Sequence, residues 1–278
     1  MKFTKKVILL PIFLCIACIP ICNSVNAEEP QSIQSYVSVG VGWEQLSYTE
    51  EVPELFLVAS DTKVNNLVLY FDGTKRLNGY FVSLKGILPV TYGDTQEYWE
   101  KAGQYVQSNS LAYRRTKVDV FFGYILNHLF NPYIGTSWSY SHQERNDFQT
   151  SNTPGVTKIS ITEEVNSLSL LLGFHGRMPI NTKWSFAYFL EYLHPYYSKV
   201  ENSSLAGWEP SNIDGYSFSL TGQLELLIAE KTALIVQAVG GQQNWDGSDW
   251  ETVGNSQVKW PENETIFIGG YVNFKKYF

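Results

Sequence analysis

Apolar and polar residues alternate, one by one, along most of the chain beyond residue 35. In the stretch 36–48, "YVSVGVGWEQLSY", valines and a tryptophan take one parity, and serine, glycine and glutamate take the other. Successive side chains of a strand point to opposite faces, so this period predicts strands with one apolar face. The same pattern recurs in 78–90, 113–126, 163–178, 183–194 and 216–228. Weaker examples lie at 64–72, 132–144 and 231–245, and a final one at 264–278. No segment has a sustained helical period, so the sequence predicts an all-β domain of about ten strands.

The connections between these strands alternate in length. The long connections are 49–63, 91–112, 145–162, 195–213 and 246–263, and the short ones are 73–77, 127–131, 179–182 and 229–230. Short turns at one end and long loops at the other are typical of outer-membrane barrels. We therefore expect a ten-stranded antiparallel up-and-down transmembrane β-barrel. A closed barrel has no free edge strand, so its backbone groups pair without disulfides.

The two faces of the predicted strands differ in kind. One face carries bulky aliphatic and aromatic residues, which suit lipid, and the other carries small polar residues with embedded charges. Nine charged or titratable residues share the inward parity: Glu44, Lys85, Arg115, Lys117, Asp119, His175, Arg177, Glu191 and Glu225. They are either a polar pathway or catalytic cluster, or a set of mutually paired side chains that fills a narrow lumen. We favour the paired filling, and a narrow channel stays an alternative.

Residues 1–27 have the layout of a secretory signal peptide: a basic start, an apolar core and small residues before Ala27. The chain's three cysteines, Cys15, Cys18 and Cys22, all lie in this leader. Removing its three lysines from the 20 basic residues leaves 17 against 27 acidic ones, a net charge of −10. This acidic balance disfavours nucleic acid as a partner. The expected domain is 28–278, located in a bacterial outer membrane.

The last strand-like run, "IFIGGYVNFKKYF" at 266–278, resembles the insertion signal of Gram-negative outer-membrane barrels. That signal has Gly-x-x-apolar-x-apolar spacing, which Gly269, Val272 and Phe274 match, and it ends on an aromatic residue, here Phe278. The resemblance implies that the barrel-assembly machinery recognises this strand.

Ten strands, five long outer loops and the closing stretch "NETIFIGGYVNFKKYF" resemble the omptin family of surface proteases. The family places an Asp-x-Asp pair before a Trp in the second outer loop, facing an Asp-x-His pair from the fourth. The positions of this sequence that correspond best are Asp94 and Glu97 before Trp99, and Glu191 with His194. Both pairs are three residues apart, so on a strand their members point to opposite faces. An omptin-like hydrolase is therefore the second hypothesis.

The outer rim is rich in tryptophan and acids. Residues predicted to line it are Trp99, Trp245, Asp246, Asp249, Trp250 and Glu251. Such a rim suits a cationic or sugar ligand, and the three acids offer oxygen ligands for a hard cation. The other interpretation, which we favour because three acids fall short of a full Ca²⁺ shell, is an interfacial aromatic girdle with acids bridged by divalent cations to lipopolysaccharide.

No cofactor and no metal site is predicted. The four histidines fall at different levels of the barrel, and the sequence has no nucleophile elbow, P-loop or dinucleotide-binding glycine motif. The sequence therefore predicts an integral outer-membrane protein, non-enzymatic, with a structural, surface or ligand-binding role and lipid or lipopolysaccharide as partner. The hydrolase and the narrow channel are the alternatives.

Overall fold

The structure is a computed structural model that describes residues 33–52, 58–151, 155–205 and 207–278. The predicted signal peptide, 1–27, and its boundary with the domain lie outside the described residues. The described part of the chain contains no helix that is long and apolar enough to cross a membrane.

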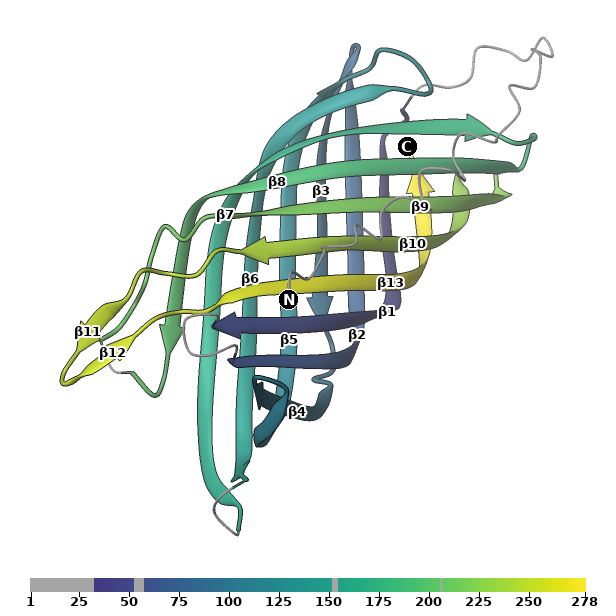
Figure 1. The fold of residues 1–278 in the computed structure, drawn as a ribbon. Coiled ribbons are helices and arrows are strands. Elements are labelled where there is room, and N and C mark those ends of the chain that lie inside the picture. Colours follow the sequence, from purple (N-terminus) through teal and green to yellow (C-terminus); the bar gives the residue numbers. More distant parts are fainter. Residues whose placement is uncertain (1–32, 53–57, 152–154, 206) are drawn as a thin grey trace. The chain divides into compact units, whose positions relative to one another are not determined.

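The described residues form thirteen strands (Figure 1). The first seven are β1 (Tyr36–Val52), β2 (Val58–Leu77), β3 (Tyr80–Pro89), β4 (Asp94–Lys101), β5 (Gln104–Tyr124), β6 (Asn131–Thr150) and β7 (Thr157–Pro179). The others are β8 (Trp184–Asn202), β9 (Gly215–Ala229), β10 (Thr232–Trp245), β11 (Glu251–Val253), β12 (Ser256–Val258) and β13 (Glu262–Tyr277). β11 and β12 pair only with each other, as a small hairpin between β10 and β13.

The remaining strands close into an antiparallel ring. β1 pairs with β2 on one side and with β13 on the other, and neighbours along the chain pair around the ring. β3 and β4 share one position, because both pair with β2 and with β5. The ring thus has ten positions, and the prediction of a ten-stranded up-and-down barrel is confirmed.

The faces of the strands are sorted as the alternation predicts. On β1, Val37, Val39 and Val41 are each more than half exposed on the outside, whereas Glu44 is completely buried inside. On β13, Ile266, Ile268, Val272 and Phe274 are exposed, and Phe278 continues their outward parity. The exposed apolar residues form an apolar belt, which on β1 ends at Trp43. An exposed apolar outside and a charged inside are the reverse of a soluble barrel.

The strand between β2 and β5 is interrupted between β3 and β4. This interruption determines which side chains of β4 point into the barrel and which point outward. The backbone N–H of Gly93 donates to Asn66 Oδ1 at 3.0 Å, and Asn66 Nδ2 donates to the carbonyl of Tyr113. A Cβ atom at Gly93 would lie 2.0 Å from the Asn65 carbonyl oxygen, so only glycine fits this approach. After the break Glu97 is fully buried, while Tyr98 is exposed.

Two predictions about the connections are wrong. The segment 73–77 belongs to β2, and the turn that follows is Asn78–Gly79, both with positive φ. Asn-Gly at the two central positions is the preferred sequence for a two-residue hairpin turn. The long connections 49–63, 91–112 and 145–162 are mostly strand, because β1, β2, β4, β5, β6 and β7 continue past the apolar belt as polar hairpins. We call the end of the barrel that carries these extensions the hairpin end, and the opposite end the turn end.

Candidate functional site

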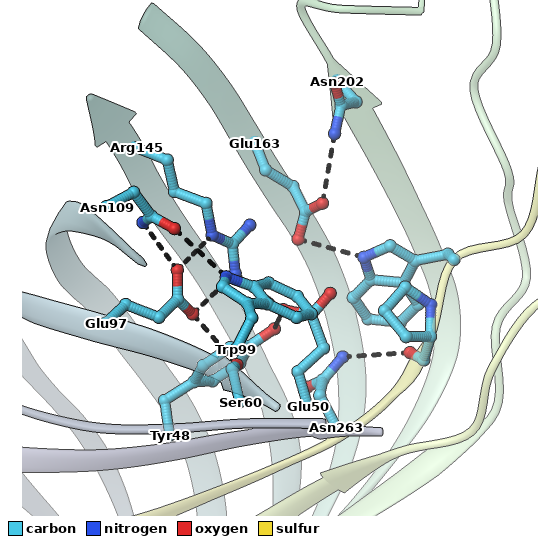
Figure 2. Close-up of polar contacts among 12 residues, drawn as sticks. Tyr48, Glu50, Ser60, Glu97, Trp99, Asn109, Arg145, Glu163, Asn202 and Asn263 are labelled. Atoms are coloured by element: carbon cyan, nitrogen blue, oxygen red, sulfur yellow. Dashed lines mark hydrogen bonds and ion pairs between the residues drawn. The ribbon is translucent and has the colours of Figure 1, made fainter. Parts of the chain in front are cut away.

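Two glutamates and one arginine meet inside the barrel at its hairpin end (Figure 2). Glu50 comes from β1, Glu97 from β4 and Arg145 from β6, and all three side chains are buried. Arg145 Nε donates to Glu97 Oε2 at 2.8 Å, and Arg145 Nη2 donates to Glu50 Oε2 at 2.6 Å. We call these three residues the outer carboxylate cluster. One guanidinium thus bridges two carboxylates, which leaves the cluster one negative charge in excess when both are ionised.

Glu97 is the more firmly held carboxylate. Ser60 Oγ donates to it at 3.0 Å and Asn109 Nδ2 at 2.8 Å, and Trp99 Nε1 fixes Asn109 through its Oδ1 at 3.1 Å. Burial alone raises the pKa of Glu97, but the Arg145 guanidinium and these hydrogen bonds outweigh burial and lower it. Glu97 therefore stays ionised, with its oxygens saturated by donors.

Glu50 has fewer donors. Besides Arg145, only Tyr48 donates to it among the described residues, at 3.0 Å. Burial raises the pKa of Glu50 to about 7, against the pull of Arg145 and with a further push from the charges of Glu163 and Glu97. Glu50 lies further along β1 than the end of the apolar belt. It is the member of the cluster that exchanges a proton near neutral pH.

A third glutamate at the hairpin end, Glu163 on β7, accepts hydrogen bonds from the end of β8 and from the β10–β13 connection (Figure 2). Trp260 Nε1 donates to Glu163 Oε1 at 3.0 Å, and Asn202 Nδ2 donates to its other oxygen at 3.4 Å. Trp260 belongs to an apolar cluster made of Val165, Val200, Trp208, Ile213, Trp245 and Trp260. This tryptophan cluster packs the β8–β9 connection against the β10–β13 connection.

The four residues suggested by the omptin resemblance are not brought together. Asp94 is exposed at the start of β4, and Glu97 belongs to the outer carboxylate cluster. Glu191 lies deeper inside, paired with Lys85, while His194 is exposed on the outer face with its Nδ1 3.8 Å from Asp214. Within the described residues, no histidine contacts the outer carboxylate cluster, so its geometry does not supply a carboxylate–imidazole pair.

The nine inward residues predicted from parity all lie inside the barrel, at three levels. Arg115 Nη2 is 2.5 Å from Glu44 Oε1 nearest the hairpin end. In the middle, Lys85 pairs with Glu191, and Lys117 Nζ lies 3.1 Å from Asp119 Oδ2. Towards the turn end, Glu225 binds Arg177 and Lys275, and His175 stacks among aromatic rings 5.1 Å from Phe81 and 5.2 Å from Phe189.

Sequence reasoning missed Glu50, Arg145 and Lys275. Glu50 has the same parity as Glu44 on β1, and Lys275 has the parity opposite to the outward Phe274, so both had a usable signal. Arg145 had no such parity signal, because it lies in a stretch of β6 without apolar alternation.

The predicted ligand-binding rim divides into two kinds of residue. Trp99 is half-buried over Arg145, and Trp245 is buried with its ring centroid 6.2 Å from that of Trp260. Trp250 and its neighbours Asp249 and Glu251 remain exposed together, and Asp246 is exposed as well. Within the described residues, no group of three or more acidic, histidine or cysteine side chains is placed to hold a metal ion.

The arrangement of strands matches a solved structure closely. The outer membrane protease OmpT from Escherichia coli superposes with a TM-score of 0.65 at 10% sequence identity, over 92% of this chain and 99% of OmpT. The chain has the fold of an omptin-like outer-membrane barrel. The expected omptin resemblance is thereby supported at the level of the fold, and at this identity an omptin-like fold does not carry an activity with it.

Other outer-membrane barrels overlap less well. The translocator domain of the autotransporter NalP from Neisseria meningitidis gives a TM-score of 0.38 at 11% identity, over 90% of each chain. Ail, the attachment invasion locus protein of Yersinia pestis, gives 0.32 at 9% identity, over 87% of this chain and 99% of Ail. No protein-family model matches the sequence, and neither does any curated protein.

Proposed function

We propose that this protein is an integral outer-membrane protein that presents its hairpin end at the cell surface and acts neither as a hydrolase nor as an open channel. The observation that carries the proposal is the pairing of the interior carboxylates with cations of the same chain. Glu44 is held by Arg115, Glu191 by Lys85 and Glu97 by Arg145. A carboxylate paired with a cation in this way is a poor base, and paired side chains leave a narrow barrel little room for ions.

The membrane placement rests on the apolar belt. Exposed aliphatic residues such as Val39 and Val236 cover its middle, and exposed tyrosines and a tryptophan such as Trp43 lie towards its edges. This distribution suits acyl chains in the centre and headgroups at the borders. Lipid and lipopolysaccharide are the partners of this surface in the proposal. The outward face of β13 is the part offered to the barrel-assembly machinery, after export directed by residues 1–27.

A surface ligand, if the protein has one, would meet the connection between β10 and β13. Trp250 is 40% exposed there, and Asp249 and Glu251 beside it are also exposed. An aromatic face next to carboxylates suits a cationic ligand. The Trp250→Ala variant is expected to lose binding to a panel of basic peptides, measured by surface plasmon resonance on detergent-solubilised protein. Unchanged binding to all of them would remove this rim from the proposal.

The experiment for the main proposal uses the full protein folded in lipopolysaccharide-containing micelles and in planar bilayers. We expect no cleavage of dibasic peptides above the background of the micelles, and no large steady single-channel current. A large steady current would overturn the sealed interior. Cleavage that disappears in Glu50→Gln and Glu97→Gln, with both variants still folded, would overturn the non-enzymatic function.

The second candidate is a hydrolase at the hairpin end. It is favoured by one specific observation: Glu50 lies beside an ionised Glu97 and has a pKa of about 7, the range that suits a general acid or base. This candidate predicts cleavage whose pH dependence follows Glu50 and which Glu50→Gln removes. The main proposal predicts no cleavage by the unmodified protein or by the Glu50→Gln variant.

A further inference from the structure

The middle of the barrel holds a cavity of about 60 Å³. On the same measure one water molecule needs roughly 10–15 Å³, so the space is that of about four to six non-hydrogen atoms. Its wall contains the middle charges Lys85, Lys117, Asp119 and Glu191, and a row of hydroxyl groups that includes Ser137. We call it the lumen cavity; it is separate from the outer carboxylate cluster, whose residues do not line it.

Two buried polar atoms on this wall have no hydrogen-bond partner among the described residues: Asp119 Oδ1 and Ser137 Oγ. Asp119 and Ser137 are each 1% exposed and face each other across the β5–β6 ladder. Leaving such groups unpaired costs free energy, so they favour a molecule that donates to Asp119 and either donates to Ser137 or accepts from it. A hydroxyl group does both.

The charges on the wall argue for a neutral occupant. Lys117 Nζ lies 3.1 Å from Asp119 Oδ2, and Lys85 is paired with Glu191. Two ammonium groups and two carboxylates therefore balance, and the other two charges on the wall, Arg115 and Asp72, are also of opposite sign. An ion would add an uncompensated charge to a buried site.

Aromatic and aliphatic side chains complete the wall, among them Phe121, Phe189 and Val239. They suit the C–H groups of a small molecule whose hydroxyls point to the polar side. The lining also reaches Pro195 and the outward-facing Tyr216, next to the place where the β8–β9 ladder ends at Leu193 and Ser217. The lumen cavity thus extends to the barrel wall at this position.

We propose that the lumen cavity is a binding site for a small neutral polyol of about four to six non-hydrogen atoms, the size of glycerol. Its hydroxyls complete the hydrogen bonds of Asp119 and Ser137, and its carbon atoms lie against Phe121 and Phe189. The site goes beyond the surface function proposed above and is independent of it.

The test uses the full protein in detergent micelles, with ¹³C-labelled glycerol as the probe and saturation-transfer NMR as the measurement. Sorbitol serves as the oversized probe and glycerol 3-phosphate as the charged one. We expect saturable binding of glycerol that is at least tenfold tighter than that of either other probe. Ser137→Val, which fills part of the cavity, is expected to abolish the signal, and Ser137→Ala, which removes one hydrogen bond, to weaken it about fivefold.

Ser38→Val is the matched control. Ser38 is a buried interior serine whose hydroxyl likewise lacks a partner among the described residues, but it does not line the cavity. Glycerol binding that is equal in Ser38→Val and the unmodified protein, and lost in Ser137→Val, supports the site. Absence of saturable binding, equal binding in Ser137→Val, or tighter binding of glycerol 3-phosphate overturns it and leaves a cavity that holds water only.

Discussion

The outer carboxylate cluster and the middle charges of the barrel are built from the same residue types but differ in their charge balance. The outer cluster has two carboxylates for one guanidinium, with Glu163 near enough to add to the repulsion. The middle group has two carboxylates, Asp119 and Glu191, for the two ammonium groups of Lys85 and Lys117. A buried group whose charges balance is held together by mutual attraction, whereas the surplus carboxylate of the outer cluster takes up a proton more readily.

The largest expected effect comes from removing the only cation of the outer cluster. Arg145→Met leaves Glu50 and Glu97 buried side by side without compensation, so we expect a loss of about 3–5 kcal/mol in the free energy of unfolding. The measurement is urea unfolding in lipid vesicles, read by tryptophan fluorescence. Arg114→Met, which alters a half-buried arginine stacked 4.0 Å over Tyr92, is the control. A loss below 1 kcal/mol for Arg145→Met would mean that the two carboxylates are hydrated.

Among the four middle charges of the barrel, removing the charge of one residue unbalances the other three. Glu191→Gln leaves two ammonium groups for one carboxylate, and we expect it to lower the free energy of unfolding by about 2–3 kcal/mol. The double variant Lys85→Met, Glu191→Gln restores the balance and is expected to recover at least half of that loss. If the double variant is as unstable as the sum of its two single variants, the middle group is not held together by charge balance.

Replacing a glutamate by glutamine in the outer cluster, in Glu50→Gln, is expected to raise the free energy of unfolding instead of lowering it. The pKa of Glu50 is raised to about 7 in the folded protein, above its ordinary value near 4.5, so the folded state binds the extra proton between these pH values. The contribution of Glu50 to the free energy of unfolding is therefore fully present below about pH 4.5 and is lost as the pH rises through 7. We expect Glu50→Gln to change little at pH 4.5 and to stabilise the protein by about 1–3 kcal/mol at pH 8.

The check is a pair of urea titrations at pH 5 and pH 8 for the unmodified protein and Glu50→Gln. Glu97→Gln is the control whose effect stays the same between these two pH values, because the lowered pKa of Glu97 gives stability that is fully present above about pH 4.5 and is lost only on further acidification. A flat pH dependence of the unmodified protein between 5 and 8 contradicts the role assigned to Glu50.

The part of the fold that obeys a two-residue period could be predicted from the sequence, and the rest could not. Alternation in β1 and β13 placed Val39 and Val272 outside and Glu44 inside, because the apolar belt imposes one face on every strand that crosses it. Beyond the belt both faces of a hairpin meet polar surroundings. In 58–66 and 104–112 the apolar period therefore vanishes, although the strands continue.

The candidate site was out of reach for a related reason. Glu50 and Arg145 are 95 positions apart in the sequence, and their meeting depends on the registers of all the strand pairs between β1 and β6. The sequence shows that Glu50 and Arg145 are charged, but it does not show which residue each of them pairs with. Trp245 illustrates the same limit, since its place in the rim predicted from the sequence suggested an exposed side chain and the structure buries it.

The smallest expected effect concerns the hydrogen bond that joins Glu163 to the tryptophan cluster. Trp260→Phe keeps most of the apolar contacts but removes the indole N–H that donates to Glu163 at 3.0 Å, so a buried carboxylate oxygen loses a donor. We expect a loss of about 1–2 kcal/mol in the free energy of unfolding. Trp250→Phe, at an exposed tryptophan of the same connection, is expected to stay within about 0.5 kcal/mol. Equal losses in the two variants would show that packing of the connection, and not the bond to Glu163, sets the stability of the hairpin end.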